Sequence, residues 1–224
     1  MKKLLVSIIA TCLAFAATAS AAHTASRTGT YSSSNGNSGT FATSTTRSAG
    51  ARSTDTTWTN QSGQVGSKAS SSTWSASTQS GTYSSTTNHI DGKTSSRSGT
   101  VTETAPNTYE IQGTKTGQNG GVSTVDLTKV TSATGSTTTG TITGPKGGVS
   151  TVDTSVTKTS DSVTKDRIVT LPNGKTDTRD VTTQLNPDGS GTRTVVVTDA
   201  KGKSVTRTED FSAPTVTVTP SPHG

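Results

Sequence analysis

Apolar residues recur near alternate positions in the second half of the chain, with threonine and serine between them. Val122, Val125 and Leu127 follow this spacing approximately, and Val216 and Val218 follow it strictly. A period of two residues is that of a β-strand with one buried face. Threonine and valine also pack well on a pleated surface, so the pattern predicts strands.

Turn signals separate these segments at a regular interval. The heptapeptide GGVSTVD occurs at residues 120–126 and again at 147–153, an offset of 27 residues. Other glycines continue this spacing within about one residue: Gly39, Gly66, Gly92, Gly174 and Gly202. A second set of turn signals lies half a period away. The chain is therefore predicted to repeat a two-strand unit about seven times.

The clearest turns lie near the C-terminal end, at residues 171–175, 186–190 and 199–203. In the first two, proline followed by Asn or Asp and then Gly fits a type I turn closed by a glycine bulge, and Ala200-Lys201-Gly202 in the third also fits a hairpin turn. The residues expected to set the register of the strands are Gly120, Gly147, Asn173, Gly174, Asp188, Gly189 and Gly202. We therefore predict an all-β fold, either an elongated antiparallel hairpin meander or a β-solenoid-like repeat.

The first 21 residues have the features of a secretory signal peptide. Lys2 and Lys3 precede an apolar run, and small residues around Ala21 form the expected cleavage site. The run is too short for a permanent membrane anchor, and no later segment resembles one, so we expect no transmembrane segment in the mature chain. The predicted location is extracellular or periplasmic, in a bacterium. Cys12 is the only cysteine and would leave with the signal peptide, so no disulfide is expected.

Composition suggests that order increases along the chain. Only 25% of the residues are hydrophobic, which makes disorder a competing interpretation. We predict weakly ordered or irregular β repeats over residues 22–100, regular hairpins over 101–213 and a flexible proline-containing tail over 214–224. The first of these regions is modestly basic, and the second has balanced charges that we expect to form cross-strand pairs on an exposed face.

The sequence offers little support for catalysis or metal binding. His23, His89 and His223 are far apart, and cysteine is absent from the predicted mature chain, so triads, zinc sites and thiol chemistry lack their side chains. Asp126 and Asp153 occupy the same place in two copies of the repeat, as structural duplication would produce. We predict a non-enzymatic protein without cofactor or metal.

The expected function is a secreted structural or adhesive protein of the cell surface or extracellular matrix. One alternative is a carbohydrate-binding module that uses Trp58, Trp74 and Tyr83, since exposed rings stack on sugars. Another is an ice-binding protein, because Thr-x-Thr sequences resemble the threonine arrays of ice-binding solenoids. Candidate partners are surface glycans or anionic envelope polymers, and open sheet edges would allow self-association. The small positive charge predicts no nucleic-acid binding.

Overall fold

The computed structural model describes residues 22–219, and all regular elements in this range are β-strands. Their bounds are β1 Ala22–Ser33, β2 Ser38–Ser48, β3 Ala51–Asn60, β4 Val65–Thr73, β5 Ser80–Asn88, β6 Thr94–Ala105, β7 Thr108–Thr116, β8 Val122–Ser132, β9 Gly135–Thr143, β10 Val149–Lys158, β11 Ser162–Thr170, β12 Thr176–Leu185, β13 Gly191–Thr198, β14 Ser204–Phe211 and β15 Thr215–Thr219. From β1 to β14, each strand pairs antiparallel with the next one in the chain. The predicted all-β hairpin meander is confirmed.

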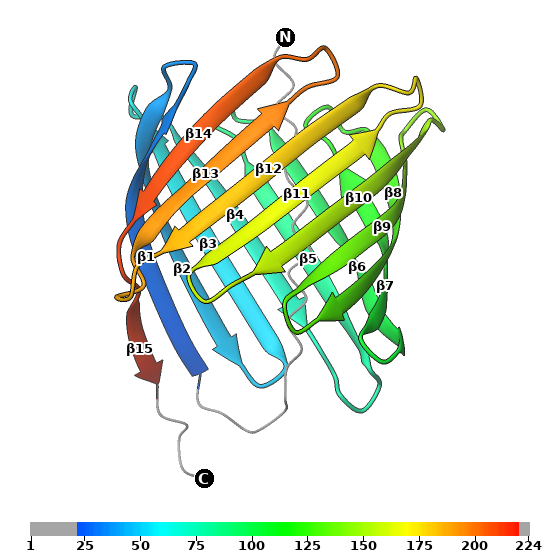
Figure 1. The fold of residues 1–224 in the computed structure, drawn as a ribbon, viewed down its shortest axis with the longest axis horizontal. Helices are drawn as coiled ribbons and strands as arrows, with labels where there is room; N and C mark the ends of the chain where they lie inside the picture. Colours follow the sequence, from blue (N-terminus) through cyan, green and yellow to red (C-terminus); the bar gives the residue numbers. More distant parts are fainter. Residues whose placement is uncertain (1–21, 220–224) are drawn as a thin grey trace.

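The meander closes into a barrel because its first and last long strands also pair. β1 and β14 are antiparallel neighbours from Gly29↔Phe211 to Ser33↔Arg207. The other end of β1 pairs with β15, from Ala22↔Thr219 to Ser26↔Thr215. Figure 1 shows β15 leaving the barrel wall beside β1. Closure pairs the two edges that an open meander would expose, and the alternative of a solenoid is replaced by a barrel.

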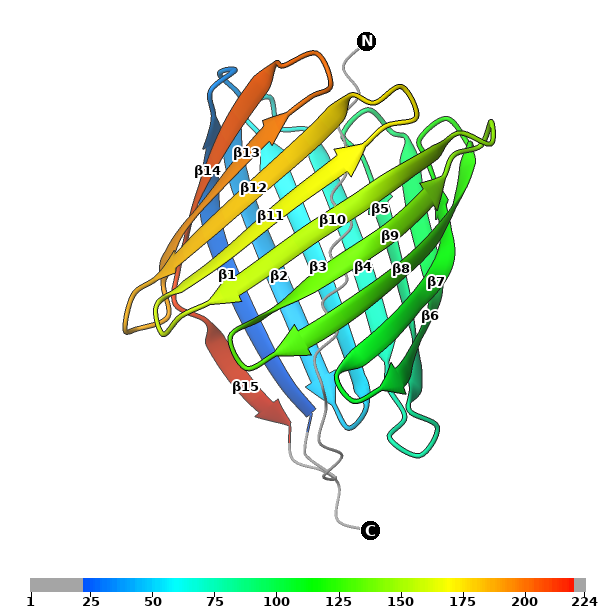
Figure 2. The same ribbon diagram turned by 45° about the vertical axis from the view of Figure 1, so that its right-hand side comes forward.

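The 27-residue interval is the length of one hairpin around this barrel. Turns that follow odd-numbered strands contain glycines with positive φ, among them Gly36, Gly63, Gly120 and Gly147. These turns all lie at one rim, the upper rim in Figures 1 and 2. In the first two units the turn glycine lies three residues earlier than the expected Gly39 and Gly66, which instead belong to β2 and β4.

The remaining predicted turn residues lie in turns as well. Gly174 and Gly202 have φ of 77° and 80° and belong to the glycine-turn rim, next to Asn173. Gly189 has φ of 83° and lies with Asp188 at the opposite rim, between β12 and β13. The Asp188 carboxylate accepts a hydrogen bond from the Ser190 backbone N–H at 2.9 Å, which closes an Asx turn.

The sheet continues through the predicted boundary near residue 100. Residues 22–105 form β1 to β6 of the same barrel, and β6 crosses the boundary without interruption. Part of the expected C-terminal tail forms β15. The predicted signal peptide, residues 1–21, and residues 220–224 lie outside the described residues. Within residues 22–219, no helix has the length and apolar character to span a bilayer.

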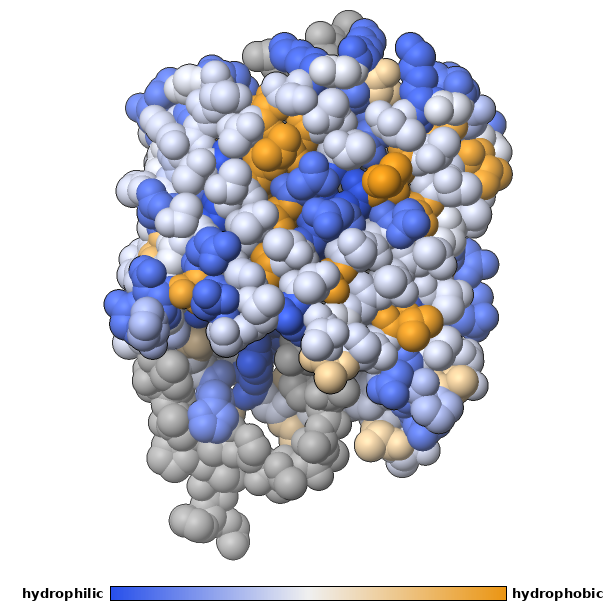
Figure 3. Space-filling model, in the orientation of Figure 1, coloured by the Kyte–Doolittle hydropathy of each residue, from blue (hydrophilic) through white to orange (hydrophobic). Residues whose placement is uncertain are grey.

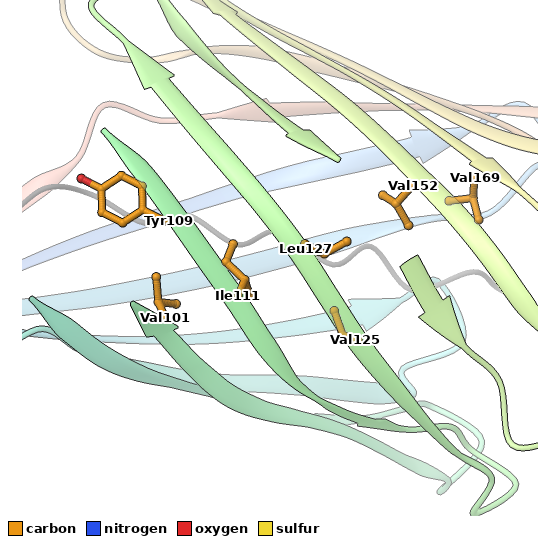
Figure 4. Close-up of a cluster of buried hydrophobic side chains, with 7 residues drawn as sticks. All are labelled: Val101, Tyr109, Ile111, Val125, Leu127, Val152 and Val169. Atoms are coloured by element: carbon orange, nitrogen blue, oxygen red, sulfur yellow. The ribbon is translucent and has the colours of Figure 1, made fainter. Parts of the chain in front are cut away.

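Alternation along each strand separates an inner face from an outer face. On β8, Val125, Leu127 and Lys129 are buried, whereas the intervening Asp126 and Thr128 are exposed. The buried apolar residues come from neighbouring strands and form one cluster on the inner side of the wall, shown in Figure 4: Val101, Tyr109, Ile111, Val125, Leu127, Val152 and Val169. The barrel therefore buries its largest apolar cluster on the inner face, together with inward hydroxyls such as Ser85 and Thr154, while Val122, Val149 and Ile168 are exposed on the outer face.

Candidate functional site

The outer face of the barrel is covered mainly by threonine and serine. The outward positions of β9 are Thr137, Thr139, Thr141 and Thr143, and hydroxyl residues recur at equivalent places on most strands. Figure 3 shows one side of the molecule as mostly pale, with scattered orange apolar residues. Because adjacent strands lie about 4.8 Å apart and alternate residues about 6.8 Å apart, these hydroxyls form a regular two-dimensional array.

Hydrogen bonds between neighbouring hydroxyls tie parts of this array together. The side-chain oxygens of Ser71 and Ser84 are 2.7 Å apart, and those of Thr198 and Ser204 are also 2.7 Å apart. Thr192 donates to the Asp210 carboxylate at 2.8 Å. Such cross-strand pairs fix the orientation of the side chains that form them, so these parts of the outer face present ordered hydroxyl groups.

The outer wall carries negative charge only. Its charged residues, at outward positions of β1 to β14, are Asp55, Glu110, Asp126, Asp153, Asp166, Asp180 and Asp210. Asp166 and Asp180 are direct cross-strand neighbours. Partial burial and this neighbouring carboxylate raise the pKa of Asp180. In the described strands no lysine or arginine occupies an outward position.

The basic residues of the strands instead share the inner face. They include Arg27, Arg47, Arg52, Lys68, Arg97, Lys115, Lys129, Lys165, Arg167, Arg179, Arg193 and Arg207. The acidic residues at inward positions of the described strands are Glu103, Asp177 and Glu209. The interior of the barrel, which we call the lumen, is therefore strongly cationic.

These cations are crowded along the wall and across the lumen. Arg97 and Lys115 are direct cross-strand neighbours, as are Arg167 and Arg179. Burial, followed by the positive charges of Arg97, Arg179 and Arg193, lowers the pKa of Lys68 to about 8. β4 carries Lys68, whereas β12 and β13 carry Arg179 and Arg193 on a distant part of the wall. Basic side chains from separate parts of the wall thus converge in the lumen.

Lys165 is in a similar environment. Burial is the largest cause that lowers its pKa to about 8, and nearby cations, Arg167 first among them, add to the effect. Burial also lowers the pKa of Lys115 and, to about 10, that of Arg179. The buried Nε of Arg179 has no hydrogen-bond partner. The lumen therefore holds partly buried cationic groups, and among the described residues Lys68, Lys115, Lys165 and Arg179 form no ion pair with a carboxylate.

One inward carboxylate, that of Glu209, forms ion pairs with two arginines. Glu209 lies 3.2 Å from Arg193 Nη1 and 3.1 Å from Arg207 Nε. The Arg207 guanidinium also lies 4.1 Å from the centre of the Tyr31 ring, a cation–π contact. We expected cross-strand ion pairs on an exposed face; this correction places them on the inner wall, where the phase of the strand turns Arg193, Arg207 and Glu209 inward.

The three predicted sugar-stacking residues are not gathered into one exposed face. Trp58 lies on the inner wall with its ring pressed on Gly66, its cross-strand neighbour. Tyr83 extends its hydroxyl over Gly99 and Gly113. Trp74 packs edge-on against Tyr109, with ring centroids 5.8 Å apart and planes at 68°. Each ring thus has an intramolecular contact that occupies at least part of its surface.

Polar groups with catalytic potential are dispersed. His89 lies between β5 and β6, where its Nε2 is 3.0 Å from Ser95 Oγ, and His23 lies on β1. His223 falls outside the described residues. Among residues 22–219 no three His, Cys, Asp or Glu side chains are grouped so that they could hold a metal ion.

The sequence interpretation overlooked the cationic lumen, although a signal was present. Lys129 continues the alternate spacing of Val125 and Leu127, and Arg167 precedes Val169 by two residues. Bases in the same phase as buried apolar residues must share their face of the sheet. The prediction of charge pairs on an exposed face does not take this phase into account.

No protein-family model matches the chain, and no curated protein is significantly similar to it.

Proposed function

We propose that this protein is a secreted, non-catalytic component of the bacterial cell surface or extracellular matrix that acts by adhesion through its outer wall. The observation that carries this proposal is the array of outward threonine and serine hydroxyls over most of the barrel. Hydroxyls donate and accept hydrogen bonds, as do the hydroxyls of glycans. Each such contact is weak in water, so binding would come from many simultaneous contacts.

The charges of the outer wall favour neutral glycans over anionic envelope polymers as its partner. Asp126, Asp153, Asp166 and Asp180 on β8 to β12 would repel carboxylate or phosphate groups, and the outward strand positions offer no compensating base. Closure of the sheet also removes the two open edges through which a meander could self-associate. The outer edge of β15 remains as a short site for strand pairing.

Carbohydrate binding through Trp58, Trp74 and Tyr83 is less well supported than binding through the outer wall. A ring must expose a free face to stack on a sugar, and contacts with Gly66, Tyr109 and other inner-wall residues use part of these surfaces.

Ice binding is a second candidate because columns of threonine do occur on the outer wall. Thr137, Thr139 and Thr141 form one such column on β9. However, the barrel wall is curved (Figure 2), so a flat crystal face could contact only a few adjacent strands. Inhibition of ice recrystallisation by the purified protein would support this candidate over adhesion.

Substitutions on β9 and β10 test the adhesive function. We would replace Thr137, Thr139, Thr141 and Thr151 together by valine, which keeps shape and strand preference but removes four hydroxyls. The matched control replaces the same residues by serine and keeps the hydroxyls. Retention on a panel of insoluble neutral polysaccharides should fall several-fold for the valine variant only. Equal retention of both variants, with loss in Trp74→Ala, would instead favour the aromatic site.

A further inference from the structure

The barrel places its positive charges inside and most of its negative charges outside, an arrangement that lowers the stability of the folded protein when no anion is bound. The bases of the strands point into the lumen, where their side chains are partly or wholly buried, whereas most of the acids of the strands point outward. Burying a cation without a partner costs several kcal/mol. Like charges directly opposite on neighbouring strands add to this cost, as at Arg97–Lys115 and Arg167–Arg179.

The inward acids compensate only part of this charge. Glu209 is engaged by Arg193 and Arg207. Burial and the charge of Arg97 lower the pKa of Arg167, and the nearby Asp177 offsets only part of this shift. In the described residues, Lys68, Lys115, Lys165 and Arg179 have no carboxylate within ion-pair distance. They come from β4, β7, β11 and β12, so an anion among them would be contacted from several sides of the barrel at once.

The size of the barrel and its upper rim are compatible with the entry of an anion. Barrels of about eight strands are filled by side chains, whereas about sixteen leave a water-filled channel; this barrel lies between the two. A small cavity beside Arg97 and Lys115, lined mainly by the apolar parts of Tyr83, Ile111, Val125 and Leu127, leaves about 10 Å³ for the centre of a water-sized molecule, enough for about one water. Long lysine and arginine side chains border it, and these can reorient around a larger guest.

The glycine-turn rim adds positive charge at one mouth of the lumen. Its turns carry Lys93, Lys146, Lys175, Lys201 and Lys203. The acids in these turns are Asp91 and Asp199. A basic rim leading to a basic interior concentrates anions near the mouth.

We propose that the lumen binds a compact polyvalent oxyanion, bearing several phosphate or carboxylate groups, between the basic side chains of β4 and β7 and those of β11 and β12. The anion supplies the negative charge that the inner wall lacks. Lysine ammonium groups bind its oxygens as point charges, and the arginine guanidinium can engage two oxygens at once.

Calorimetric titration of the purified protein with tripolyphosphate tests this proposal, with citrate and chloride compared at equal ionic strength. We expect saturable binding of tripolyphosphate or citrate near one equivalent, accompanied by a rise in Tm, and neither effect with chloride. The preferred anion identifies the ligand chemistry as phosphate or carboxylate. Absence of saturable binding by both would overturn the proposal.

Two double variants distinguish the lumen from a general effect of net charge. Lys165→Met with Arg179→Met removes two lumen cations but keeps long side chains, and we expect affinity to fall at least tenfold. Lys175→Gln with Lys201→Gln removes the same charge from the rim. Rim charges act mainly on association rate, so the affinity should change less than about threefold. Equal losses in the two variants would overturn the proposal, and their Tm values in chloride verify that both are folded.

Discussion

At the scale of single residues, glycines on the inner wall make room for aromatic rings of the neighbouring strand. Gly66 lies beneath Trp58, and Gly99 and Gly113 lie beneath the hydroxyl of Tyr83. In each case the glycine and the ring are cross-strand neighbours or share one row of residues around the barrel. A ring laid over a strand glycine covers backbone that would otherwise lack side-chain packing. These pairs help to define the register of strands whose other side chains are small.

The Gly66–Trp58 pair gives the sharpest prediction at this scale. A Cβ added at Gly66 would overlap the Cε2, Nε1 and Cζ2 atoms of the Trp58 indole. Gly66→Ala should therefore lower the free energy of unfolding by about 1–3 kcal/mol, measured by urea denaturation. In the background Trp58→Ala, the same substitution should cost much less, because the clash is gone. Additive costs of the two substitutions would show that the ring does not rest on Gly66.

At the scale of elements, the repeated heptapeptide is a hairpin strand with a fixed inner and outer pattern. Val125 and Val152 are buried at equivalent positions, with 6% and 5% of their surfaces exposed, while Asp126 and Asp153 face outward. The preceding glycine turn ends each time at the same rim. In both copies of the segment, the same positions therefore face inward and the strand begins at the same rim of the barrel.

The turn between β9 and β10 allows the glycine requirement to be tested within one segment. Gly147 has φ of 79° and no neighbour that an added Cβ would meet, so Gly147→Ala should cost about 1–2 kcal/mol through backbone strain alone. Gly144→Ala, in the same turn, lacks the positive φ and meets only ordinary contact. Its effect on the urea midpoint should be clearly smaller. Similar shifts for both substitutions would contradict a role for the left-handed conformation at Gly147.

Strands, turns and antiparallel order could be predicted from the sequence because they depend on local signals. The alternation of Val125 and Leu127 and the Pro-Asn-Gly turn at residues 172–174 are examples. Closure of the sheet depends on the pairing of Gly29 with Phe211, which no local pattern reveals. The N-terminal strands were expected to be irregular because serine and threonine replace valine there, yet their backbone pairing and the Trp58–Gly66 contact continue the same sheet.

At the scale of the whole molecule, the barrel combines a cationic interior with a hydroxyl-rich and acidic exterior. The formal net charge of +6 conceals this separation, because inner bases and outer acids largely cancel in the sum. The two faces therefore suit different ligands: neutral hydrogen-bonding surfaces outside and anions inside. Burial of the inner lysines, together with repulsion from neighbouring cations, also makes the stability of the barrel depend on pH.

Lys68 and Lys165 determine the sign of that pH dependence. Their pKa values are about 8 in the folded protein, against 10.5 for an ordinary lysine. Below pH 8 both folded and unfolded chains hold these protons, so the cost of burying the charges is fully present. Between pH 8 and 10.5 the folded chain releases protons that the unfolded chain retains, and stability rises with pH. At about 1.4 kcal/mol per pKa unit, the full gain by pH 10.5 is on the order of 3–4 kcal/mol for each lysine.

Urea denaturation between pH 7 and pH 10, in buffers without polyvalent anions, measures this gain. The unfolding free energy of the natural chain should increase across the range as Lys68 and Lys165 lose their protons beside Arg97, Arg179, Arg193, Arg167 and Lys129. The double variant Lys68→Met and Lys165→Met should be more stable at pH 7 and show a flatter profile. A natural chain whose stability is constant or falls over this range would mean that the two ammonium groups are well solvated, and the lumen would then lack the unrelieved charge on which anion binding depends.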